Sequence, residues 1–170
     1  MTNILEANSQ DAQELEQLVN SAYRGDSSKR GWTTEADLLD GTRTDAAALQ
    51  QLMQEKNTTI LKYVEHEKIK ACIELKTTPE GLYLGMLTVQ PDLQGKGIGK
   101  ILLGAAEDYA RRMNLKKIFM TVISVRAELI AWYVRHGYRD TGKRKAFNFS
   151  DPRFGQPKQP LEFTELEKEI

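Results

Sequence analysis

A short glycine-rich segment, residues 94–100, has the residue types and spacing to bind an anion. It reads Gln-Gly-Lys-Gly-Ile-Gly-Lys and joins a hydrophobic run, residues 82–89, to an amphipathic run, residues 98–113. This order predicts a strand, a turn and the start of a helix. Glycines let several backbone N–H groups converge on one point, and the helix start adds unpaired N–H donors and the positive end of its dipole. The segment is therefore a candidate phosphate-binding loop, although a connection without a ligand would have the same composition.

The spacing within this segment excludes two common phosphate-binding patterns. A P-loop requires Gly-Lys followed by Ser or Thr, but Ile101 follows Gly99 and Lys100. The dinucleotide fingerprint requires a third glycine three residues after the second, and Lys100 and Leu102 stand where that glycine would have to be. The pattern that remains is Gln-x-x-Gly-x-Gly after a strand.

Composition narrows the class of protein further. The chain has 170 residues with 24 basic and 24 acidic side chains, so it has the size of one domain and no net charge. Balanced charge predicts neither a nucleic-acid partner nor a membrane surface. The N-terminus lacks the features of a signal peptide and no apolar run could span a bilayer, so we expect a cytoplasmic protein. Cys72 is the only cysteine and His66 and His136 the only histidines, so no metal site is expected.

The apolar pattern predicts helices first, then a meander of strands, then alternating strands and helices. Ser9 is expected to cap a helix that ends near Tyr23, and Thr33 or Thr34 to cap a short helix over residues 32–39. A further helix follows from residue 44 to 53. The expected strands are at residues 4–7, 59–64, 69–75, 82–89, 117–122 and 161–166. The strands at 82–89 and 117–122 should pair in parallel, because a helix lies between them.

Together these features resemble the GCN5-related N-acetyltransferase superfamily. Its pyrophosphate-loop pattern is matched by Gln94, Gly97 and Gly99, and its second motif, Tyr-x-x-x-Gly-Phe/Tyr, by residues 133–138. The resemblance covers nearly the whole chain and implies one domain over residues 1–170. The implied fold is α/β, with a central, mostly antiparallel, twisted mixed sheet of about seven strands flanked by about four helices and splayed at the acyl-CoA site.

The resemblance implies acetyl-CoA as the acyl donor and no metal. Backbone amides on the strand at residues 87–89 would pair with the pantetheine arm and bind the thioester carbonyl. Arg126 stands where many members carry an asparagine, so it could instead face the acceptor or solvent. The implied cofactor-binding residues are Leu87, Thr88, Val89, Gln94, Gly95, Lys96, Gly97, Ile98, Gly99, Lys100, Arg126 and Tyr133.

Two residues are candidates for the chemistry of acyl transfer. The resemblance places Tyr133 beside the cofactor sulfur as a general acid, and a tyrosine in a helix core is the alternative. Because a phenol with a pKa of about 10 is a weaker acid than a thiol at about 8.5, Tyr133 could stabilise the leaving thiolate by hydrogen bonding. Glu74 lies on a predicted central strand and could accept the proton that an ammonium must lose. The alternatives are that ordered water is the base, and that Glu74 is a solvated side chain without a catalytic role.

In this superfamily the acceptor pocket is usually built from the region after the first helix and from the last strands. The aromatic and cationic residues of those regions are Tyr23, Arg24, Trp32, Arg43, Arg144, Arg153 and Phe154. They would suit an amine that also carries a carboxylate or phosphate. We therefore expect an N-acetyltransferase acting on a primary amine of a small molecule or peptide, and a homodimer is common in such proteins. The alternatives are a non-catalytic acyl-CoA-binding module, and an acyltransferase for another acyl chain or a hydroxyl acceptor.

Overall fold

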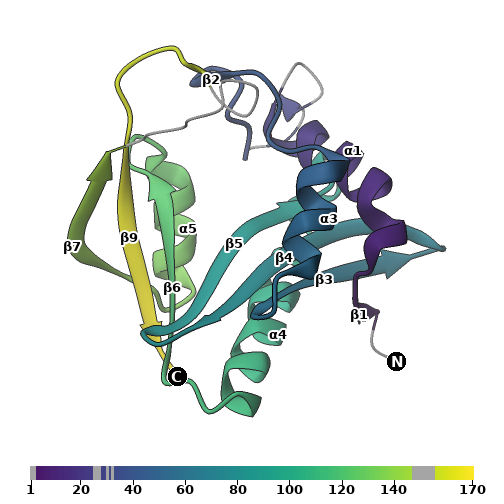
Figure 1. Ribbon diagram of the computed structural model, residues 1–170. Helices are drawn as coiled ribbons and strands as arrows, with labels where there is room; N and C mark the ends of the chain where they lie inside the picture. Colours follow the sequence, from purple (N-terminus) through teal and green to yellow (C-terminus); the bar gives the residue numbers. More distant parts are fainter. Residues whose placement is uncertain (1–2, 25–27, 30, 32, 147–155) are drawn as a thin grey trace.

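The computed structural model describes residues 3–24, 28–29, 31, 33–146 and 156–170 (Figure 1). Its main feature is a seven-stranded sheet in the order β1-β3-β4-β5-β6-β9-β7. The strands are β1 (Ile4–Glu6), β3 (Thr58–Glu65), β4 (Lys68–Thr78), β5 (Gly81–Val89), β6 (Lys117–Ile123), β7 (Arg139–Ala146) and β9 (Glu162–Glu169). A separate two-stranded sheet pairs β2 (Leu39–Asp40) with β8 (Gln156–Pro157).

The two faces of the large sheet are covered by different helices. The helices α1 (Ala12–Tyr23) and α3 (Ala46–Gln54) pack on one face against Ile60 and Cys72. On the other face, α4 (Ile98–Arg112) and α5 (Ala127–Arg135) pack against a second apolar cluster that includes Ile73 and Leu82. The fold is therefore a mixed α/β structure with a seven-stranded sheet and four helices in the described part of the chain, as the sequence predicts.

Most of the predicted strand pairing is confirmed. The strands β3, β4 and β5 form an antiparallel meander, and the first hairpin turns through His66 and Glu67, both with positive φ. Strands β5 and β6 are parallel, as expected for two strands separated by a helix. Strand β7 lies in a segment for which the sequence predicts only a mixed structure.

Two local predictions are wrong. Asn8 rather than Ser9 caps the first helical turn: its side chain accepts a hydrogen bond from the Gln10 N–H, and Ser9 is the first residue of a 3-10 turn before α1. Residues 33–39 contain no helix. The Thr34 hydroxyl instead accepts a hydrogen bond from the Ala36 N–H in a tight turn that leads into β2. Such local side-chain bonds compete with helix formation.

The sheet opens between its two halves, which creates the site. Strands β5 and β6 pair only at Leu82 with Ile118 and at Tyr83 with Phe119. Figure 1 shows β5 and β6 diverging beyond this point. A bulge adds to the divergence, because the β4–β5 register shifts between Cys72 and Glu74. No helix in the described residues is both long and apolar enough to cross a membrane.

Candidate functional site

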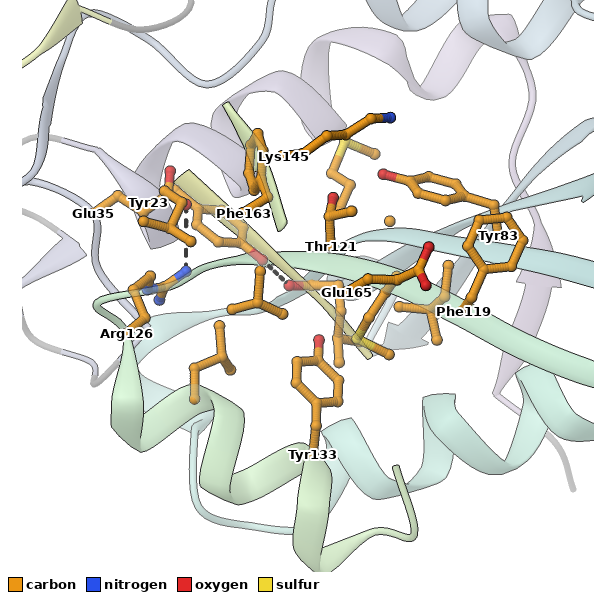
Figure 2. A pocket seen from close by; sticks show the side chains of 18 of the residues that line it. Tyr23, Glu35, Tyr83, Phe119, Thr121, Arg126, Tyr133, Lys145, Phe163 and Glu165 are labelled. Carbon is orange, nitrogen blue, oxygen red and sulfur yellow. Dashed lines mark hydrogen bonds and ion pairs between the residues drawn. The ribbon is translucent and has the colours of Figure 1, made fainter. Parts of the chain in front are cut away.

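A cavity of about 1020 Å³ fills the opening between β5 and β6. Its walls come from both halves of the sheet, from the end of α1 and from α5, so residues far apart in sequence meet there (Figure 2). Leu84, Gly85, Met86 and Leu87 line it along the edge of β5. The cavity combines an open strand edge with titratable side chains.

The edge of β5 offers backbone groups to this cavity. Among the described residues, β6 pairs with β5 only up to Tyr83, so the edge from Leu84 onward has no partner strand on that side. The Tyr23 hydroxyl, on α1, donates a hydrogen bond to the Leu87 carbonyl, which shows that this carbonyl faces away from β4 (Figure 2). The Thr88 side chain is buried and donates to the Met86 carbonyl. The Thr88 hydroxyl is therefore already engaged within β5.

The glycine-rich loop has the backbone geometry of an anion cradle. Gly95 and Gly97 have φ of +83° and +87°, and a Cβ added to either would meet no atom within 4 Å. Gly97 precedes α4, so the N–H groups of Ile98, Gly99 and Lys100 lack intrahelical acceptors. Lys96 and Lys100 are exposed and add positive charge. The loop therefore has both the space and the donors for a phosphate group.

Gln94 and Gly99 hold this loop in place. The Gln94 side-chain amide donates to the Thr33 hydroxyl (2.8 Å) and to the Val89 carbonyl (3.1 Å), which ties the loop to β5. A Cβ added to Gly99 would lie 3.1 Å from the Trp132 ring, so the missing side chain lets α4 and α5 approach closely. These two residues thus contribute to the packing of the loop.

Tyr133 reaches the cavity from α5. Its ring is buried between Trp132 and Tyr138 in edge-to-face contacts with centroid distances of 5.1 and 5.7 Å. Figure 2 shows its hydroxyl directed into the cavity. Burial raises the pKa of this phenol well above 10, and the neighbouring Tyr23 and Tyr138 add to the effect. Tyr133 is therefore a neutral hydrogen-bond donor over the physiological pH range.

A buried cluster of one carboxylate and two arginines forms another wall of the cavity. Glu35 lies 3.0 Å from the Arg24 guanidinium and 3.3 Å from that of Arg126. Arg126 also donates to the Thr33 carbonyl (Figure 2). The cluster thus joins the end of α1, the segment at Thr33 and the start of α5. Arg24 and Arg126 are both engaged within the protein, although they were expected to meet the acceptor and the cofactor.

Glu74 lies beside the cavity wall. A Cβ added to Gly85 would be 3.3 Å from the Glu74 Oε1 atom and 2.8 Å from the Tyr83 ring, so both side chains lie against this glycine. Gly85 lines the cavity, whereas Glu74 does not. Burial raises the pKa of the Glu74 carboxyl above its ordinary value, and the positive charge of Arg43 opposes this shift. Glu74 is thus a half-buried carboxylate one residue away from the cavity.

The other expected acceptor residues have different outcomes. Tyr23 and Arg43 line the cavity, and the Arg43 guanidinium lies 5.8 Å from the centre of the Tyr23 ring. Arg144 also lines it but binds Asp140 on its own strand at 2.9 Å. Three expected residues, Trp32, Arg153 and Phe154, lie outside the described residues. In the described part of the chain, no three His, Cys, Asp or Glu side chains are grouped to hold a metal.

Several cavity residues are missing from the sequence prediction. Tyr83, Phe119 and Thr121 alternate along their strands with the buried residues Leu82 and Met120. This alternation places the three side chains on the face opposite the buried residues, and it can be seen in the sequence. It does not indicate that this face of the strands lines a cavity. Glu35, Lys143 and Lys145 also line the cavity and lie in the two regions expected to build the acceptor pocket, residues 23–43 and 143–155, although the prediction did not single them out. Phe163 and Glu165 line it from outside those regions.

Comparisons with known proteins agree with this geometry. The N-acetyltransferase from Staphylococcus aureus Mu50 has a TM-score of 0.75 at 16% identity, covering 99% of this chain and 97% of that chain. The ribosomal-protein-S18-alanine N-acetyltransferase from Escherichia coli has a TM-score of 0.72 at 15% identity, covering 100% and 94%. The PaiA N-acetyltransferase from Thermoplasma acidophilum, solved in complex with coenzyme A, has a TM-score of 0.69 at 16% identity, covering 98% of both chains. At these identities the likeness shows the fold.

Sequence comparison identifies the family. A search of curated protein sequences found no match. The sequence model of the acetyltransferase (GNAT) family matches residues 13–138, which is well over half of the chain. This chain belongs to the acetyltransferase (GNAT) family.

Proposed function

We propose that this protein is an acetyl-CoA-dependent N-acetyltransferase that transfers the acetyl group directly to a primary amine. The observation that carries the proposal is the cavity in the opening of the sheet, where the unpaired edge of β5 and the Tyr133 hydroxyl meet. Family membership supports an acyltransferase reaction. Two similar structures were solved as complexes: PaiA with coenzyme A, and a putative streptothricin acetyltransferase from Bacillus anthracis with acetyl coenzyme A.

The residues that would hold acetyl-CoA fit its chemistry. The open, positive-φ glycines Gly95 and Gly97 leave room for a pyrophosphate at the start of α4, with Lys96 and Lys100 as accessory charges. The exposed edge of β5 carries amide and carbonyl groups that would pair with the amides of the pantetheine arm, as a neighbouring strand would. The N–H groups of this edge would also donate to the thioester carbonyl.

The transfer needs a proton acceptor and a group near the sulfur. The acceptor enters as an ammonium, loses one proton to Glu74 or to a water molecule beside it, and its nitrogen attacks the acetyl carbonyl carbon. The C–N bond forms, the C–S bond breaks, and the second proton of the nitrogen passes to the leaving sulfur, giving an amide and a free thiol. The raised pKa of Tyr133 keeps its phenol protonated, so it would stabilise the sulfur by donating a hydrogen bond. Both reactants are held in one cavity, which removes much of the entropic cost of their meeting.

Two measurements test the proposal. Calorimetry should show that the protein binds acetyl-CoA, and thiol release should rise when primary amines are added. The variant Y133F should keep acetyl-CoA affinity while thiol release falls. Tight binding of acetyl-CoA without amine-dependent thiol release would instead favour a non-catalytic acyl-CoA-binding module. No binding of acetyl-CoA would refute the proposal outright.

A further inference from the structure

The two carboxylates that line the cavity are both engaged by other groups of the protein. Glu35 lies between two buried arginines in the cluster described above. Glu165 accepts a hydrogen bond from the Thr141 hydroxyl at 2.9 Å and lies 3.8 Å from the Lys143 ammonium. Glu35 is therefore committed to the two arginines, whereas the contacts of Glu165 use its Oε2 atom and engage this carboxylate only in part.

Two cations of the cavity wall have no such partner. Among the described residues, no carboxylate lies within ion-pair distance of Arg43 or Lys145. Burial raises the pKa values of Tyr23, Glu74 and Tyr83, and the positive charge of the half-buried Arg43 guanidinium opposes this rise at all three side chains. Lys145 is exposed and lies among the side chains around the cavity (Figure 2). The described walls of the cavity thus carry two cations without a carboxylate partner, against one carboxylate, Glu165, that is only partly engaged.

From this imbalance we propose that the acceptor is a primary amine that also carries an anionic group, a carboxylate or a phosphate, bound by Arg43 with Lys145 as a second contact. The proposal rests on the N-acetyltransferase function proposed above and adds the acceptor class. A guanidinium binds either anion through paired N–H groups. The amine would then lie on the side of Gly85 and Glu74, close to the edge of β5.

The same charges disfavour other amines. A polyamine or an aminoglycoside carries several positive charges and would place them beside Arg43 and Lys145, where like charges repel. The rings of Tyr23, Tyr83 and Phe119 offer apolar surface to the carbon skeleton of the acceptor. A compact amine with one anionic group and some apolar surface fits these walls better than a polycation does.

Thiol release from acetyl-CoA with matched pairs of amines tests the proposal. L-phenylalanine and 2-phenylethylamine differ by the carboxylate, and phosphoethanolamine and ethanolamine by the phosphate. The wild-type protein should prefer the anionic member of at least one pair, and which pair responds distinguishes carboxylate from phosphate. Spermidine and an aminoglycoside serve as polycations. R43Q should lower kcat/KM for the preferred anionic amine by about tenfold to hundredfold, the range for a lost charged hydrogen bond.

The variants separate recognition from general damage. R43Q should leave the KM for acetyl-CoA unchanged and should lower the rate far less with the member of each pair that lacks the anionic group than with the anionic member. R43K should fall between R43Q and wild type. R135Q is the matched control, because Arg135 is an exposed arginine on α5 that does not line this cavity. It should behave as wild type with every amine. Equal loss with both members of a pair in R43Q would contradict the proposal.

A binding measurement that needs no turnover completes the test. Saturation-transfer NMR with the CoA-saturated protein should show the anionic amines bound to wild type and R135Q and released by R43Q. The proposal would be overturned if the protein prefers polycations. It would also be overturned if anionic amines do not bind, or if they bind R43Q as well as they bind wild type. Failure of the proposed function is distinguishable, because it would appear as absent acetyl-CoA binding in calorimetry without any acceptor.

Discussion

Gly97 and Gly104, at the start and inside of α4, should respond in opposite ways to replacement by alanine. Gly97 has φ of +87° and precedes α4, whereas Gly104 lies inside α4 without a positive φ. A Cβ added to either residue would meet no atom within 4 Å. Steric clash is therefore removed from the comparison, and only the backbone conformation of each position differs.

The magnitudes follow from that difference. A left-handed backbone costs a residue with a Cβ atom about 1–2 kcal/mol, so G97A should lower the free energy of unfolding by that amount. Replacing a glycine inside a helix by alanine stabilises by about 0.5–1 kcal/mol, so G104A should raise it. The two variants should thus differ by at least about 1.5 kcal/mol with opposite signs relative to wild type.

Urea denaturation of the three proteins, followed by circular dichroism, measures these differences. Calorimetric titration with acetyl-CoA adds the functional side, because G97A changes the proposed pyrophosphate loop and G104A does not. Affinity should fall for G97A and stay at the wild-type value for G104A. If the two variants shift stability in the same direction, or if G97A is neutral, the left-handed conformation of Gly97 is not a constraint and the geometric account of the loop is refuted.

Three further predictions concern the cavity. E35Q replaces one carboxylate oxygen of the buried cluster by an N–H donor that faces a guanidinium, so it should lower the free energy of unfolding by about 3–5 kcal/mol in urea denaturation. The control D108N breaks the exposed pair with Arg111 and should cost under about 1 kcal/mol. Equal effects of the two variants would contradict the role of the cluster. Because the pKa of Glu74 is raised in the folded protein, its contribution to stability is present below its unfolded pKa and is lost as the pH rises through the folded pKa. E74Q should therefore raise the melting temperature at about pH 8 and leave it unchanged at about pH 4. The same difference in melting temperature at both pH values would refute burial as the cause. Y133F should lower kcat by about tenfold or more without changing the KM for acetyl-CoA, measured by thiol release under conditions where chemistry limits the rate; an unchanged kcat would remove Tyr133 from the mechanism.

The strands that alternate clearly were predictable from sequence. In β4, the sequence places Ile73 and Leu75 on the face opposite Glu74, and both pack into the cluster under α4. Strand β7 could not be predicted, because its residues are almost all polar and exposed and it forms by pairing with β9. A polar edge strand has no alternation of apolar and polar residues from which a strand could be predicted.

The site was predictable where it depends on local backbone and not where it depends on distant partners. The glycine loop follows from spacing, because positive φ is a local property. The sequence predicts a helix start at Glu35, yet its carboxylate is held by Arg24, eleven residues before it, and by Arg126, ninety-one residues after it. These contacts give the two buried arginines a partner of opposite charge. No pattern within the segment indicates them.

The open edge of β5 has one more consequence, which concerns contact with other chains. A strand edge without a partner is ordinarily a place where a second protein molecule can add a strand and start aggregation. Here the edge faces inward between the two halves of the sheet, and the Tyr23 hydroxyl already occupies the Leu87 carbonyl. A whole strand of another protein would have to displace Tyr23 and enter a cavity walled by β6 and α5. The fold therefore leaves backbone groups open to a narrow ligand while protecting them from a neighbouring polypeptide.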